Sequence, residues 1–189
     1  MNFTYELVGR GWADSVLKLD GKTLYFSVSY LSDALSDLLN QLLYLAPESL
    51  NDNEIVVNRE IFWHAEPGGA YWVLERINNF EIRVKIESVT DVTNLDSSRN
   101  TEINTICNYD EFLETIIMAM DIIIKKYGFV GYRESWVNFD FPIYPYLKLK
   151  HYLLKKEKYP LEEKAEDGYK EFFKSNLQHE MSLLNKTSC

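Results

Sequence analysis

The side chains best suited to acid–base or metal chemistry are three histidines and two cysteines: His64, His151, His179, Cys107 and Cys189. No histidine lies within four residues of another histidine or of a cysteine, so the short ligand spacings of zinc sites do not occur. The two cysteines match no disulfide framework. From the sequence we therefore expect neither a metal site nor a cofactor.

One short segment does bring a base and a carboxylate together. His64 and Glu66 are two residues apart in a predicted strand, and such residues point to the same face. They could form an acid–base pair or hold a metal ion, although an exposed histidine beside a glutamate in a turn is the commoner arrangement. Cys107 could act as a nucleophile only if a histidine approached it in the fold, and a buried structural cysteine is more frequent.

Motifs for phosphate binding and for hydrolysis are absent. Gly68 and Gly69 lie between two predicted strands, so no helix N-terminus faces a phosphate there. The G-x-S-x-G motif of serine hydrolases does not occur. We assign no catalytic residue, and the sequence favours a binding protein over an enzyme while leaving enzyme activity open.

The element that positions His64 and Glu66 is the segment 61–88, which predicts three antiparallel strands. Its turns fall at 67–69 and 78–79, where proline, glycine and asparagine gather. A four-residue first loop would set Trp63 opposite Trp72.

For the second turn, a three-residue loop at 77–79 sets Leu74 opposite Ile82 and places every large apolar side chain on one face. Its disadvantage is that Glu75 then lies opposite Glu81, a like-charge pair. A two-residue turn would instead set Glu75 opposite Ile82. We prefer the three-residue loop.

In the preferred register the segment has one apolar face and one mixed face. The predicted core face carries Ile61, Trp63, Trp72, Leu74, Phe80, Ile82, Val84 and Ile86. The opposite face carries Phe62, His64, Tyr71, Val73, Glu75, Arg83, Lys85 and Glu87.

The remaining segments predict strands before this sheet and helices around it. A hairpin at Asp20-Gly21 joins strands over 13–19 and 22–30. A leucine-rich helix follows and ends at Ala46-Pro47, with Asp37, Asn40 and Gln41 off its apolar face. A largely apolar helix over 112–127, capped by Asn108 or Asp110, ends at Gly128, and a short helix over 129–138 can follow it.

These elements indicate an α+β fold: an antiparallel sheet of about five to six strands, made of the N-terminal hairpin and the central meander, packed against helices. We divide the chain into a single α+β domain over 1–154 and a charged amphipathic helical extension over 155–189. An apolar stripe at helical spacing in this extension suggests that it docks on the domain or pairs with a second copy: Tyr169, Phe172, Phe173, Leu177, Met181 and Leu184.

Composition restricts the kinds of partner. The formal net charge of -9 disfavours binding to nucleic acid, because an acidic surface repels the phosphate backbone, and it would suit a basic protein. No secretory signal is visible, and the longest apolar run, 116–124, contains Asp121 and is too short to span a bilayer. We therefore expect a soluble cytoplasmic protein with no membrane partner.

Several motifs resemble those of a known group. They are SYLSDA at 29–34 before a leucine-rich helix, WHAEPGG at 63–69 followed by Tyr71-Trp72, and a buried helix ending near Tyr132 and Trp136. Over roughly residues 10–140 the chain resembles a group of small, uncharacterised bacterial proteins, some of which serve as immunity proteins in polymorphic-toxin systems. The resemblance implies a toxin-neutralising role and no catalytic residue.

Two hypotheses follow for function. In the first, an acidic surface that also carries aromatic side chains binds a protein partner, with His64, Glu66, Tyr71 and Glu75 as the contact residues. In the second, the protein binds a small molecule or is an enzyme, with a pocket near His64, Glu66 and Tyr71. A homo-oligomer formed through the C-terminal helix is a further possibility.

Overall fold

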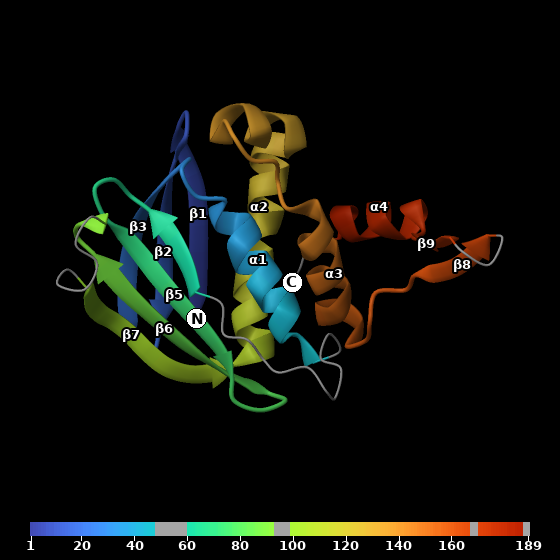
Figure 1. Ribbon diagram of the computed structural model, residues 1–189, viewed down its shortest axis with the longest axis horizontal. Helices are drawn as coiled ribbons and strands as arrows, with labels where there is room; N and C mark the ends of the chain where they lie inside the picture. Colours follow the sequence, from blue (N-terminus) through green and yellow to red (C-terminus); the bar gives the residue numbers. More distant parts are fainter. Residues whose placement is uncertain (48–59, 93–98, 167–169, 187–189) are drawn as a thin grey trace.

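The computed structural model describes residues 1–47, 60–92, 99–166 and 170–186. The fold is α+β, with two antiparallel sheets against helices and a separate hairpin (Figure 1). The first sheet has the order β1-β2-β3 and the second β4-β5-β6-β7. The strands are β1 (Asn2–Gly9), β2 (Trp12–Leu19), β3 (Lys22–Ser29), β4 (Glu60–His64), β5 (Gly69–Arg76), β6 (Glu81–Val89), β7 (Arg99–Asn108), β8 (Glu162–Glu166) and β9 (Lys170–Lys174). The helices are α1 (Ala34–Leu45), α2 (Tyr109–Trp136), α3 (Ile143–Lys155) and α4 (Leu177–Asn185).

The prediction of one sheet is wrong, because the N-terminal strands and the meander form separate sheets. Both sheets have an apolar face, and the two faces share one core. The ring of Phe26 on β3 lies 5.9 Å from the ring of Trp63 and 5.3 Å from that of Trp72. β3 thus packs beside β4 and β5 without joining their hydrogen-bond ladder.

The predicted faces of the meander are correct except at Phe80, but both pairings are two residues out. Trp63 lies opposite Ala70, and Trp72 lies opposite Ile86. A shift of two residues keeps every side chain on its face. The seven other predicted core residues are therefore buried as expected: Ile61, Trp63, Trp72, Leu74, Ile82, Val84 and Ile86.

Turn chemistry explains the shift at the second turn. The Asn78 side-chain oxygen accepts hydrogen bonds from the backbone N–H groups of Phe80 and Glu81, at 2.8 and 3.0 Å. This Asx-type turn includes Phe80 in the loop, where its side chain is 72% exposed. Glu75 then faces Arg83 instead of Glu81, so an ion pair replaces the like-charge contact of the predicted register.

The helices cover the core side of the second sheet. Of the leucines predicted on the apolar face of α1, only Leu43 is not fully buried, and the Trp63 indole donates to the Ala34 carbonyl at 3.1 Å. Helix α2 begins at the predicted cap, since the Asn108 side chain accepts from the Glu111 backbone N–H. Its helical geometry is interrupted at Gly128 (φ 65°, ψ 176°), where the sequence predicted one helix to end before a second.

The C-terminal region is only partly helical. The strands β8 and β9 form a hairpin that projects from the body, and α4 is the one helix in the described residues after Lys156 (Figure 1). The predicted helical stripe is confirmed for Leu177, Met181 and Leu184, which lie on α4. It is wrong for Phe173, which is exposed on β9, where the strand register pairs Glu162 with Lys174. Tyr169 of the predicted stripe lies outside the described residues. No helix among the described residues is long and apolar enough to cross a membrane.

Candidate functional site

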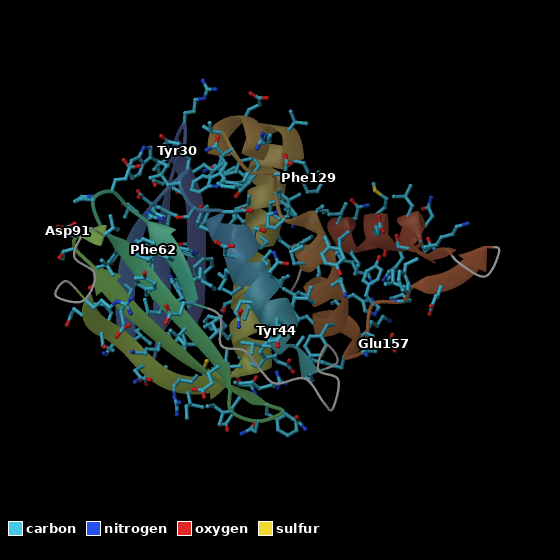
Figure 2. All side chains as sticks on the ribbon, in the orientation of Figure 1. Tyr30, Tyr44, Phe62, Asp91, Phe129 and Glu157 are labelled. Atoms are coloured by element: carbon cyan, nitrogen blue, oxygen red, sulfur yellow. The ribbon has the colours of Figure 1, made fainter. Side chains whose placement is uncertain are left out.

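The outer face of the four-stranded sheet carries a row of rings in contact, edge to face between Phe62 and His64 and tilted between Phe62 and Tyr71. Phe62 lies between His64 and Tyr71, with ring centroids 4.5 Å from each (Figure 2 labels Phe62). The guanidinium carbon of Arg99 on β7 lies 4.0 Å from the centroid of Tyr71. We call His64, Phe62, Tyr71 and Arg99 the aromatic row. Two of the four residues predicted as contacts, His64 and Tyr71, are therefore joined through a residue that the prediction did not single out.

A charge network continues from the end of the aromatic row. The Glu87 carboxylate lies 2.8 Å from the Lys85 ammonium and 3.6 Å from the Arg99 guanidinium, and it accepts a hydrogen bond from Thr101. These contacts, with the Lys85 hydrogen bond as the largest, lower the pKa of Glu87. Arg99 is thus fixed both by Glu87 and by the Tyr71 ring.

Glu75 and Glu66 do not join the aromatic row. Glu75 is four residues beyond Tyr71 on β5, about 13 Å at strand spacing, and its carboxylate pairs with Arg83 at 2.7 Å. It borders a shallow hollow of about 770 Å³ across β5, β6 and β7. Glu66 is exposed in the turn before β5, at a cis bond to Pro67. Among the described residues, Glu66 forms neither a hydrogen bond nor an ion pair with His64.

Gly69 shapes this end of the sheet. A Cβ atom at Gly69 would lie 2.3 Å from the Trp63 carbonyl oxygen and 2.6 Å from Cζ of Phe62. A Cβ atom at Gly68 would lie 2.0 Å from the Val89 carbonyl oxygen. Both contacts are too short for any larger residue. The two glycines therefore let the turn backbone approach Val89 and Trp63 closely, and Gly69 leaves room for the Phe62 ring in the aromatic row.

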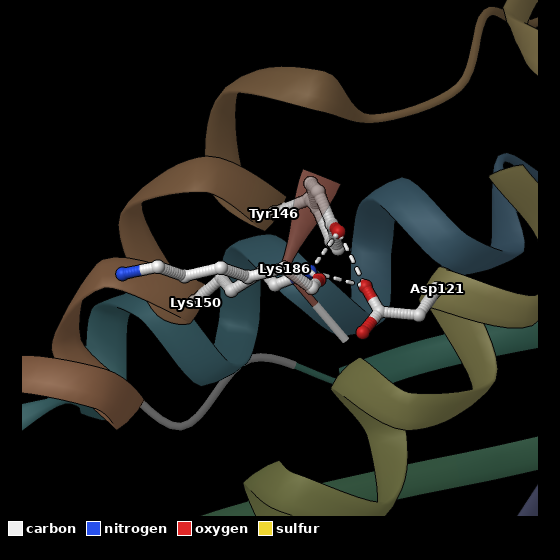
Figure 3. A network of polar contacts seen from close by, with 4 residues as sticks. All are labelled: Asp121, Tyr146, Lys150 and Lys186. Atoms are coloured by element: carbon white, nitrogen blue, oxygen red, sulfur yellow. Dashed lines mark hydrogen bonds and ion pairs between the residues drawn. The ribbon is translucent and has the colours of Figure 1, made fainter. Parts of the chain in front are cut away.

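A second polar cluster lies buried between α2 and α3 (Figure 3). The Lys150 ammonium is fully buried and donates to Asp121 Oδ1 at 2.6 Å, the Tyr146 hydroxyl at 2.8 Å and the Lys186 carbonyl at 2.7 Å. Tyr146 in turn donates to Asp121. Burial, reinforced by the hydrogen bond to Asp121, raises the pKa of Tyr146. Each of the three ammonium hydrogens has an acceptor, so the cluster binds the C-terminal segment to the helices.

Sequence reasoning missed this cluster. Its one visible signal is Asp121, an acidic residue inside the longest apolar run. Tyr146 and Lys150 are separated by one helical turn, but the same spacing occurs on many solvent-exposed helix faces. Nothing local to the sequence indicates that α3 turns this pair toward Asp121.

The structure brings together two histidines that the sequence keeps apart. The Nδ1 atom of His151 lies 2.9 Å from Nε2 of His179, and the Tyr159 ring lies beside both. Burial and, secondarily, His179 lower the pKa of His151. His64 takes no part in this pair. In the part of the chain that is described, no group of three or more histidine, cysteine, aspartate or glutamate side chains could hold a metal ion.

Cys107 has the properties of a structural cysteine. It lies near the end of β7, half buried, and burial together with the nearby Glu111 charge raises its pKa to about 11. At neutral pH the thiol is therefore protonated and a poor nucleophile. Cys189 lies outside the described residues.

The described residues thus offer a preorganised surface on the outer sheet face and a tightly paired buried cluster. Comparisons of the chain with protein-family models, with curated proteins and with solved structures find no match in any of the three.

Proposed function

We propose that this is a binding protein of the immunity type, which captures a toxin partner through the outer face of the four-stranded sheet. The observation that carries the proposal is the aromatic row, where three rings and a guanidinium contact one another in sequence on a face opposite the helices. Tyrosine, phenylalanine and arginine are enriched in protein interfaces. Because neighbouring side chains already hold these groups, binding loses little side-chain entropy.

Ion pairs on the outer face of the four-stranded sheet change the role expected of Glu75 in partner binding. Glu75 and Glu87 are both paired with basic side chains, so the face is close to neutral. Its affinity would come mainly from the rings. The net charge of -9 belongs to the whole chain and would accelerate encounter with a basic partner at long range.

The experiment is co-expression with the product of the neighbouring gene, scored by growth, followed by titration calorimetry of the purified pair. Tyr71→Ala and Phe62→Ala should each weaken binding at least tenfold and abolish rescue of growth, with unfolding still cooperative. The matched control is Tyr25→Ala on β3, because that side chain is 79% exposed and belongs to the other sheet. No rescue by the wild-type chain, or equal affinity in all variants, would contradict the proposal.

A small-molecule site is the second candidate, favoured by a cleft of about 570 Å³ between β3 and the second sheet. Phe26, Trp63 and Ile86 line it, with Ser27 and Ser88 among the polar lining residues. His64, Glu66 and Tyr71 are not among its lining residues, so the ligand would bind on the opposite side of β5 from the predicted pocket. Ser88→Trp should fill the cleft and abolish any thermal stabilisation that a ligand screen finds.

Pairing of two copies is proposed at the C-terminal region. Leu177 and Met181 on α4 and Phe173 on β9 are exposed apolar side chains. Light scattering should give a dimer mass for the full chain and a monomer mass after truncation before Tyr159. A monomer mass for the full chain would refute this part of the proposal.

A further inference from the structure

Strand β7 forms the open edge of the four-stranded sheet. It is the last strand in the order β4-β5-β6-β7, so it pairs with β6 on one side only. The neighbouring edges are occupied: β3 lies beside β4 and β5, and α2 packs along β1, where the Tyr127 hydroxyl donates to the Leu7 carbonyl at 3.2 Å. Figure 1 shows β7 at the rim of the sheet, on the side away from α1 and α3.

Hydrogen-bond alternation shows which backbone groups of β7 point away from β6. The Tyr109 N–H donates to the Phe80 carbonyl at 2.8 Å, directly after the last residue pair of the β6–β7 ladder. Bonded and non-bonded pairs alternate in an antiparallel ladder, so Thr105, four residues before Tyr109, also bonds to β6. The N–H and C=O groups of Asn104 and Ile106 therefore point to the outer edge.

This edge lacks the usual protection against strand pairing. Natural sheets protect open edges with charged side chains, proline or a short edge strand. β7 has 10 residues, and its stretch Ile103–Asn108 contains neither a charged residue nor a proline. The Lys22 ammonium donates to the Glu102 carbonyl at 2.6 Å, before this stretch begins. Among the described residues, no loop or helix forms a backbone hydrogen bond to Asn104 or Ile106 from outside the sheet. An extended segment of another chain can therefore add here as a further strand.

The side chains of β7 restrict the segment that fits. On the core side, Thr105 and Cys107 are only half buried, so small apolar side chains of an added strand would complete their burial. On the outer side, Asn104 and Ile106 are exposed and line the hollow of about 770 Å³. Glu111 is exposed in the first turn of α2, directly after β7, so a lysine or arginine at that end of the segment would meet its charge.

We propose that the protein partner adds an extended segment to the outer edge of β7, with apolar side chains toward the core and a basic residue beside Glu111. The inference rests on the protein-binding function proposed above and states how the partner docks. Arg99 joins the two surfaces, because it lies on β7 and belongs to the aromatic row. The net charge of -9 favours a basic segment over a second copy of this chain.

Amide hydrogen exchange of the full chain, followed by nuclear magnetic resonance, tests the edge directly. In the free protein the amides of Asn104 and Ile106 should exchange at least tenfold faster than that of Thr105, which bonds to β6. In the complex with the product of the neighbouring gene, both outward amides should slow at least tenfold. Slow exchange of both amides in the free protein would mean that the edge is already covered, and it would overturn the inference.

Proline substitution removes one outward N–H group without breaking the β6–β7 ladder. Asn104→Pro should weaken binding of the neighbouring gene product at least tenfold in titration calorimetry. Asn104→Ala, the matched control, loses the same side chain but keeps the N–H group, and it should bind as the wild type does. If Asn104→Pro does not unfold cooperatively, Ile106→Pro compared with Ile106→Ala makes the same test, and the proline variant should again bind at least tenfold more weakly.

The outcomes separate this inference from the function on which it rests. Binding by the folded proline variant that equals binding by its alanine control overturns strand addition but not protein binding. A complex in which the amides of Asn104 and Ile106 exchange as fast as in the free protein does the same. No complex with the wild-type chain overturns both. Glu111→Lys should weaken binding, and unchanged or tighter binding would contradict the basic residue in the segment.

Discussion

Replacing Lys150 by methionine should destabilise the protein far more than an ordinary surface change. The substitution keeps most of the aliphatic stem but removes the ammonium that Asp121, Tyr146 and the Lys186 carbonyl share. Asp121, only 4% exposed, would then be a buried carboxylate with a single hydroxyl donor from this cluster. Removing one partner of a buried ion pair costs about 3–5 kcal/mol of unfolding free energy.

A double-mutant cycle isolates the pair. Asp121→Leu combined with Lys150→Met leaves no buried charge, so the double variant should lose about 2 kcal/mol or less relative to the wild type. The coupling energy between the two positions should then exceed about 2 kcal/mol. Lys148→Met, two residues away on α3 and partly exposed, serves as the control and should stay within about 0.5 kcal/mol of the wild type.

The assay is urea unfolding followed by circular dichroism and tryptophan fluorescence at pH 7 and pH 4.5. In Lys150→Met the buried Asp121 carboxylate has lost its cation, so the folded state should favour the neutral, protonated carboxyl. Protonation should therefore restore part of the lost stability at the lower pH. A loss below about 1 kcal/mol at pH 7, or strictly additive effects in the cycle, would refute the view that the ammonium and the carboxylate stabilise each other.

Three further predictions concern other positions. Burial raises the pKa of Asp33 from 3.8 to about 6. As pH rises from 4 to 7, the wild type should therefore lose about 1 kcal/mol of unfolding free energy relative to Asp33→Asn, after solvent screening. Equal pH profiles of the two proteins in urea unfolding would contradict this. The lowered pKa of His151 means that stability at the His151–His179 contact is present above pH 6.5 and lost below it, and hydrogen exchange of α4 should accelerate there in the wild type but not in His151→Phe. Gly69→Ala should cost about 2 kcal/mol or more, measured by thermal unfolding, because its Cβ would collide with the Trp63 carbonyl, and a neutral result would rule out that steric role.

Local sequence patterns predicted the helices, the strands and their buried faces better than they predicted which residues pair with one another. The leucines of α1, the Asn108 cap and the break at Gly128 all follow from local patterns that the structure keeps. The predicted pairing of Glu75 was wrong because a hydrogen bond from the Phe80 backbone N–H to the Asn78 side-chain oxygen sets the turn, and the alternation of residues along the strands does not reveal that bond.

Local sequence patterns could not predict contacts between residues that are far apart in the sequence. The separation into two sheets depends on how aromatic side chains such as Phe26 and Trp72 meet in space. The burial of Gln41, which was predicted to lie off the apolar face of α1, depends on where α3 lies over α1, which no spacing within α1 reveals. His151 and His179 are 28 residues apart, and only the path of the C-terminal segment brings them into contact.

The hydrogen bond from Lys150 to the Lys186 carbonyl makes the packing of α3 depend on a residue 36 positions later in the sequence. Without the segment that carries Lys186, the third ammonium hydrogen of the buried lysine would lose its acceptor, and water would have to enter between α2 and α3 to replace it. A protease that cuts before Lys186 should therefore loosen α3 as well, and a first cut near the C-terminal segment would favour a second cut in the helices.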